Sequence, residues 1–112
     1  MTGVAEQTQV MQKADVIRFL KGAGYDVRVL RVQMVDATHS ICRHGVVIGR
    51  LGLAGVVMPE LGMCVDYLPQ VVELAEQARA NEIPYVLENS YRIIGELECN
   101  GKDELAGRLR GL

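Results

Sequence analysis

Residues 83–101 constrain this chain most, because they hold its densest run of strand-forming side chains. They read Ile-Pro-Tyr-Val-Leu-Glu-Asn-Ser-Tyr-Arg-Ile-Ile-Gly-Glu-Leu-Glu-Cys-Asn-Gly. Two segments rich in β-branched and aromatic residues flank Asn89 and Ser90, which are residue types that favour turns. The pattern predicts a β-hairpin.

A weaker copy of this pattern lies upstream. When Gly49 is aligned with Gly95, apolar residues coincide without a gap, and Leu51 falls on Leu97. The alignment predicts two hairpin units, each preceded by a helix.

The remaining elements follow from periodicity and from turn and cap residues. Apolar residues at helical spacing predict a helix over 9–21 and a second over 66–81, and cap residues predict a short one from 102. Alternation predicts a strand over 25–35. A further hairpin is predicted over 38–53, with its turn at 43–45. The expected fold class is therefore α+β, with a mainly antiparallel sheet of about five strands and three helices packed on it. The expected order is α-β-β-β-α-β-β-α, in one domain spanning 1–112 with 1–8 as a flexible lead-in.

Composition limits the compartment and the partners. The chain has 112 residues, of which 49% are hydrophobic and 23% charged, and its net charge is -2. No basic cluster is present, which argues against nucleic acid as a partner. Three cysteines at irregular spacing and the absence of a signal-peptide pattern predict a cytoplasmic protein. No apolar run is long enough to span a membrane, so no membrane association is expected.

Residues 52–64 have no clean period and combine three glycines, a proline and the two methionines Met58 and Met63. One interpretation is a strand followed by a loop packed over the core. The other is a mobile apolar surface that binds a partner. Because apolar residues are more often buried, the packed loop is favoured.

From Ile83 onward the predicted elements are a strand beginning at Pro84, a turn, a strand ending at Gly95 and a helix from Lys102. This order resembles the last third of glutaredoxins. The resemblance implies a cis-proline at Pro84, a strand pair, and Gly95 in the glycine motif after it. The chain departs from that family in two ways: its first helix has no cysteine, and Glu96 replaces the second glycine.

Several residues could carry chemistry, but none forms a complete pattern. The His39, Cys42 and His44 group lacks the paired spacing of a zinc site, so neither a metal nor a cofactor is expected. Cys64, before the second helix, and Cys42, near His44, are the candidate reactive thiols. Catalytic residues are not assigned.

Acidic residues suggest a binding face. On the predicted last strand Glu96 and Glu98 share a face, with Arg92 nearby, and Glu73 and Glu76 lie on the outer side of the second helix. We interpret this ribbon either as a solvated surface or as a site for a basic partner.

These observations favour a non-enzymatic protein-binding module, a small inhibitor or adaptor that also self-associates as a homodimer. The expected binding residues are Arg92, Glu96, Glu98, Glu73, Glu76, Met58 and Met63. The alternative is a thiol-based, glutaredoxin-like redox protein using Cys42, Cys64 or Cys99.

Overall fold

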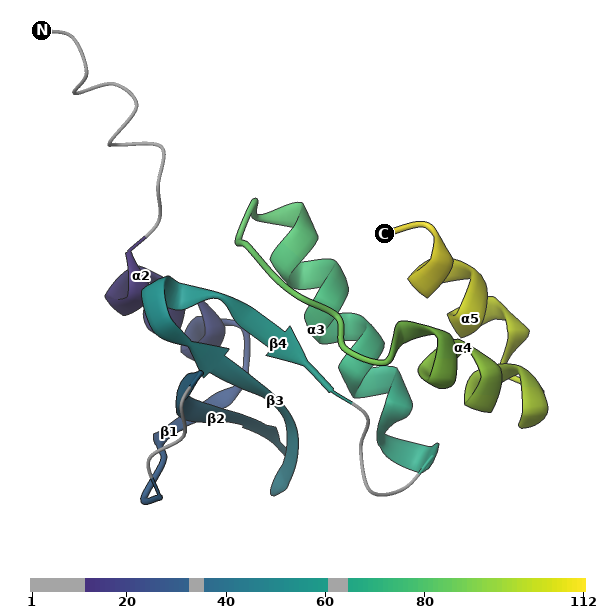
Figure 1. Cartoon of the computed structure of the whole chain (residues 1–112), viewed down its shortest axis with the longest axis horizontal. Helices are drawn as coiled ribbons and strands as arrows, with labels where there is room; N and C mark the ends of the chain where they lie inside the picture. The colour runs from purple at the N-terminus through teal and green to yellow at the C-terminus, as the bar shows by residue number, and fades with distance from the viewer. Residues whose placement is uncertain (1–11, 33–35, 61–64) are drawn as a thin grey trace, which may run out of the picture.

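The computed structural model describes residues 12–32, 36–60 and 65–112. The first half of this chain forms an antiparallel sheet and the second half is helical (Figure 1). In chain order the elements are α2 (Lys13–Gly22), β1 (Asp26–Val29), β2 (Ala37–Arg43), β3 (Val46–Gly52), the 3-10 helix η1 (Leu53–Gly55), β4 (Val57–Pro59), η2 (Val65–Tyr67), α3 (Leu68–Ala80), α4 (Ser90–Cys99) and α5 (Asp103–Arg110).

The sheet is a meander in the order β1-β2-β3-β4, with all neighbours antiparallel. Its centre is the β2–β3 hairpin, which confirms the hairpin predicted over 38–53. His44 and Gly45 make the turn with positive φ angles of 54° and 79°. Such left-handed conformations at both central residues match the right-handed twist of the two strands.

The far edge of the sheet is occupied by the segment that follows α3. The Val57 amide donates to the Pro84 carbonyl over 2.9 Å, and the Val86 amide donates to the Val57 carbonyl over 2.9 Å. Tyr85 thereby forms a parallel bridge with Val57. The segment runs beside β4 without becoming a regular strand.

Helix α3 joins the two halves of the molecule. Its buried residues recur at helical spacing, as Val71, Leu74, Ala75 and Ala78 show, and Pro69 lies in its first turn, where a proline is tolerated. The helix lies between the sheet and the α4–α5 pair (Figure 1). The helices predicted over 66–81 and from 102 are confirmed as α3 and α5. The described part of the first predicted helix is α2.

The buried side chains form one cluster that draws on both halves. Fully buried members include Leu20 from α2, Ile41 from β2, Leu74 from α3 and Leu97 from α4. The α+β class and the antiparallel sheet are therefore as predicted, with four strands and four α-helices in the described chain instead of about five and three.

The hairpin predicted over 83–101 is wrong, because residues Ser90–Cys99 form helix α4. Ile93 and Leu97 are four residues apart and both fully buried, which is the spacing of one helix face. Asn89 precedes the helix as its N-cap, so the predicted turn residue starts a helix instead of connecting two strands. Tertiary burial of the helical face outweighs the strand preference of the isoleucines.

Two dependent expectations fail with it. The aligned glycines are not equivalent, since Gly49 lies in β3 and Gly95 in α4. The strand pair implied by the glutaredoxin resemblance is absent from the described chain, and the Pro84 peptide bond is trans. The strand predicted over 25–35 is shorter, as β1 ends at Val29. The lead-in 1–8 lies outside the described residues.

Candidate functional site

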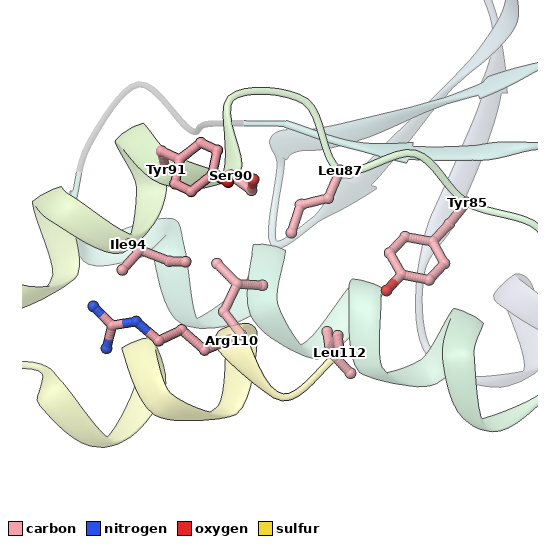
Figure 2. Close-up of a pocket in the computed structure, with 8 residues that line it drawn as sticks. Tyr85, Leu87, Ser90, Tyr91, Ile94, Arg110 and Leu112 are labelled. Atoms are coloured by element: carbon pink, nitrogen blue, oxygen red, sulfur yellow. The ribbon is translucent and has the colours of Figure 1, made fainter.

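A hollow of about 550 Å³ lies where the segment 84–89, the start of α4 and the end of α5 meet. We call it the α4–α5 groove. Figure 2 shows Tyr85 and Leu87 descending from the segment, Tyr91 and Ile94 projecting from α4, and Arg110 and Leu112 closing the far side. The lining residues are Tyr85, Leu87, Ser90, Tyr91, Ile94, Leu109, Arg110 and Leu112.

The groove combines apolar side chains with polar groups in its lining. Leu109 is buried at 4% exposure, and Tyr85, Leu87 and Ile94 are half-buried against the core. Tyr91 is 91% exposed, which makes it the most exposed large hydrophobic side chain of the described residues. A volume of this size lies in the range typical of ligand pockets, roughly 300–1,000 Å³.

Alternation along the extended segment places its side chains on two sides. Tyr85 and Leu87 pack against the core, whereas Val86 between them is 52% exposed. This is the two-residue period of an extended chain, and the bridge between Tyr85 and Val57 sets its phase. The groove therefore receives the odd-numbered side chains because the segment adds to the sheet edge.

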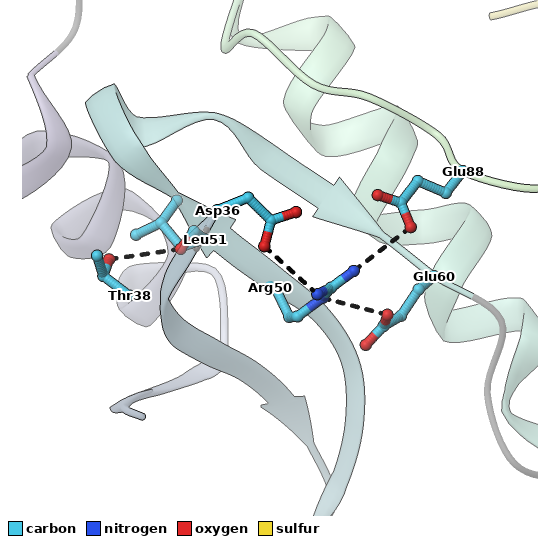
Figure 3. Close-up of polar contacts among 6 residues, drawn as sticks. All are labelled: Asp36, Thr38, Arg50, Leu51, Glu60 and Glu88. Carbon is cyan, nitrogen blue, oxygen red and sulfur yellow. Dashed lines mark hydrogen bonds and ion pairs between the residues drawn. The ribbon is translucent and has the colours of Figure 1, made fainter. Parts of the chain in front are cut away.

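Arg50 anchors the same segment from the opposite side. Its guanidinium lies 3.4 Å from Glu88, 3.3 Å from Glu60 and 3.8 Å from Asp36, so one side chain of β3 ties together three segments (Figure 3). Only 16% of the Arg50 side chain is exposed, and partial burial strengthens such a network relative to a surface pair. Arg50 is thus a positioning residue for the groove wall that contains Leu87.

Helix α5 forms the third wall of the groove, and two of its arginines pair with carboxylates of α3 and α4. Arg108 of α5 bonds to both carboxylate oxygens of Glu76 on α3, over 2.7 Å from its Nε. The hydrogen bond from Arg108 lowers the pKa of Glu76, and the same contact raises the pKa of Arg108. Arg110 pairs with Glu98 of α4, which fixes the rim of the groove.

The acidic residues predicted to bind a partner do not form one ribbon. Glu96 and Glu98 are two residues apart on a helix, so they point to different sides, whereas Arg92 and Glu96 share a side. Glu98 and Glu76 pair with arginines of α5, and Glu73 pairs with Arg43 at 3.0 Å. Three of the four carboxylates thus already have a cationic partner within the chain.

The two predicted methionines fall differently. Met58 lies in β4 and is only 7% exposed, so little of it is available for contact with a partner. Met63 lies outside the described residues. The described part of 52–64 is mostly buried, with Leu53 as an exception at 60% exposure.

The candidate reactive residues are dispersed. Cys42 is 8% exposed with the Ser40 hydroxyl 3.9 Å away, and Cys99 is exposed at the end of α4. Burial and the charges of nearby lysines lower the pKa of His39. Within 12–32, 36–60 and 65–112, no three His, Cys, Asp or Glu side chains are grouped as metal ligands. Cys64 is not among the described residues.

The groove was not predicted from the sequence because residues 83–101 were assigned to a hairpin. The helical spacing of Ile93 with Leu97, together with Asn89 as an N-cap, was the available signal for α4. With α4 in place, Tyr91 and Ile94 lie three residues apart on one face, which is the groove side.

Comparison with known proteins gives no relative for this chain. No protein-family model, no characterised protein and no solved structure matches it. Among the described residues, no helix is both long enough and apolar enough to cross a membrane.

Proposed function

We propose that this chain is a non-enzymatic protein-binding module whose α4–α5 groove holds an apolar segment of a partner protein. The observation that carries the proposal is the hollow of about 550 Å³ with Tyr91, 91% exposed, at its rim. Tyrosine is among the residue types on which protein interfaces concentrate their binding energy, because its ring supplies a large apolar contact and its hydroxyl a hydrogen bond.

The shape of the groove suits a peptide more than a flat surface. Three separate chain segments supply its walls, and the half-buried Leu87 and Ile94 form an apolar floor together with Leu109. Apolar side chains of a short segment would displace water from this floor, which is the main source of affinity in such grooves. The exposed Arg92, next to Tyr91 in the sequence, favours a peptide that also has an acidic residue.

The test is selection of displayed random peptides on the purified chain, followed by affinity measurement by fluorescence polarisation. We expect enriched peptides with two or more apolar residues. Tyr91→Asp should weaken their binding about tenfold or more, as the loss of an aromatic anchor does. The variant should fold normally, because Tyr91 is exposed and an acidic residue is favourable in the first helical turn.

Leu53→Asp is the matched control. Leu53 is also an exposed apolar residue, at 60%, but it lies in η1, away from the groove lining. We expect Leu53→Asp to leave peptide affinity unchanged. If Leu53→Asp abolished binding while Tyr91→Asp did not, the residues after β3 would be the binding surface and the groove proposal would be wrong.

The wider proposal places this binding in the cytoplasm and includes self-association. Cys42 and Cys99 are both free thiols, as expected in a reducing compartment. Homodimer formation is supported by exposed apolar side chains outside the groove, among them Val29 at 73% and Val32 at 77%.

The thiol-based redox alternative is the weaker proposal. It needs an accessible thiol beside a group that stabilises its thiolate. Cys42 is nearly buried and its nearest polar partner is a neutral hydroxyl. Alkylation of the purified chain at neutral pH tests the alternative, which requires at least one cysteine to react faster than free cysteine.

A further inference from the structure

The four-stranded sheet has two edges, and the described chain covers only one. Beyond β4, the residues Pro84 and Val86 bond to Val57 and occupy the edge. At the other side, β1 (Asp26–Val29) pairs with β2, and no other described segment pairs with its second edge. Val29 is 73% exposed there. An unblocked edge strand is a template for another strand.

The register of β1 shows which backbone groups face this free edge. The Leu30 amide donates to the Thr38 carbonyl over 3.0 Å, and Arg28 is the residue opposite Ser40. In an antiparallel pair, every second residue bonds to the neighbouring strand and the others point away. Residues 26, 28 and 30 therefore bond towards β2, and the amide and carbonyl groups of Val27 and Val29 point outward.

The side chains of β1 are self-complementary in charge. The strand reads Asp-Val-Arg-Val. If two copies pair antiparallel about Val27, Asp26 of each copy lies opposite Arg28 of the other. These are the non-hydrogen-bonded positions, where cross-strand side chains are closest. Pairing shifted to centre on Arg28 would instead set two arginines opposite each other, which is unfavourable.

We infer that a second copy of this chain binds at β1, through antiparallel strand pairing centred on Val27, so that two four-stranded sheets join into one. The inference rests on the self-association in the proposed function but not on the groove. β1 lies at the opposite side of the molecule from α4 and α5 (Figure 1), so both surfaces can be occupied at once.

The existing contacts allow this exchange at little cost. Asp26 and Arg28 form an ion pair within the strand at 2.6 Å, with side chains 50% and 70% exposed. Such an exposed pair contributes little to stability, so redirecting it across the interface loses little. Because β1 has only four residues, the affinity between the two copies should be low and the dimer should form only as the protein concentration rises.

Sedimentation velocity of the full chain over a range of concentrations tests the inference with two charge variants. Asp26→Arg sets arginine opposite arginine at both cross-strand positions, and Arg28→Asp sets aspartate opposite aspartate. Each variant alone should dimerise about tenfold more weakly than the wild type. An equimolar mixture should form a heterodimer with wild-type affinity, because the two arginines of the first variant then face the two aspartates of the second.

Three outcomes would overturn the inference: a wild-type chain that stays monomeric at every concentration, single variants that dimerise as the wild type does, or a mixture that restores nothing. Circular dichroism confirms that each variant is folded. Peptide affinity of the groove serves as the independent readout, since both variants should keep it. Loss of dimerisation with retained peptide binding therefore separates this interface from the groove.

Discussion

Tyr25 shows how a single residue links the sheet to α3. It is 3% exposed, and the Arg43 guanidinium lies 4.6 Å from the centre of its ring. Arg43 in turn pairs with Glu73 of α3. Burial, followed by the negative charge of Glu73, raises the pKa of Tyr25 to about 12. The fold therefore favours the neutral phenol.

This shift predicts a loss of stability in alkali. An unfolded tyrosine has a pKa near 10, so the stability contributed by neutral Tyr25 is complete below about pH 10 and is lost as pH rises towards 12. At pH 11 the loss should be about 1 kcal/mol relative to pH 8. Tyr25→Phe should remove this pH dependence, and the exposed Tyr91→Phe should not. Urea denaturation at both pH values measures it, and equal alkaline losses in all three proteins would contradict the account.

Alanine substitution should have opposite effects on stability at Gly49 and Gly95, because the space around the two residues differs. A Cβ on Gly49 would lie 2.8 Å from Leu74 and 3.0 Å from the Met58 carbonyl oxygen, whereas one on Gly95 would meet nothing within 4 Å. Gly49→Ala should therefore cost about 1–3 kcal/mol of unfolding free energy. Gly95→Ala should add about 0.5–1 kcal/mol, because alanine favours a helix interior. A destabilising Gly95→Ala would argue against α4.

Among the helices, the ion pair between Arg108 and Glu76 reinforces the contact of α5 with α3. The hydrogen bond from Arg108 lowers the pKa of Glu76, so this pair adds stability above the carboxyl's unfolded pKa and loses it as pH falls through the folded value. Glu76→Gln should destabilise the protein at pH 7, and the difference from wild type should disappear in acid. Glu82→Gln is the control, because Glu82 is exposed and joins none of the ion pairs of the described residues. Thermal unfolding at several pH values gives the comparison, and a pH-independent difference would contradict it.

The elements also show what the sequence could and could not predict. The β2–β3 hairpin was predictable because its turn residues lie between two short strand-forming segments, which are local features. Helix α3 was predictable because its apolar residues keep one helical period. Helix α4 was not predicted, because Tyr91, Ile93 and Ile94 suit a strand by propensity, and only packing of Ile93 and Leu97 on the core decides for a helix. The β4 strand is three residues long and too short to give a pattern.

At the scale of the whole molecule, the groove depends on contacts between distant segments. Arg50 of β3 positions the wall containing Leu87, and the α3–α5 pair positions Leu109. No single stretch of sequence contains the lining residues of the groove, which is why the groove was not predicted. The two proposed surfaces, the groove and the β1 edge, lie at opposite ends of the molecule (Figure 1). Such an arrangement would let a dimer present two grooves.

Chemical-shift mapping by NMR, with a peptide selected on the full chain, shows where the peptide binds. If the partner binds in the α4–α5 groove, saturating peptide shifts the signals of Tyr85, Leu87, Tyr91 and Ile94 most. Amides of β1 should change little, because they belong to the other surface. Shifts concentrated around Leu53 or β1, or no peptide-dependent shift in the groove, would contradict the claim that this protein binds its partner there.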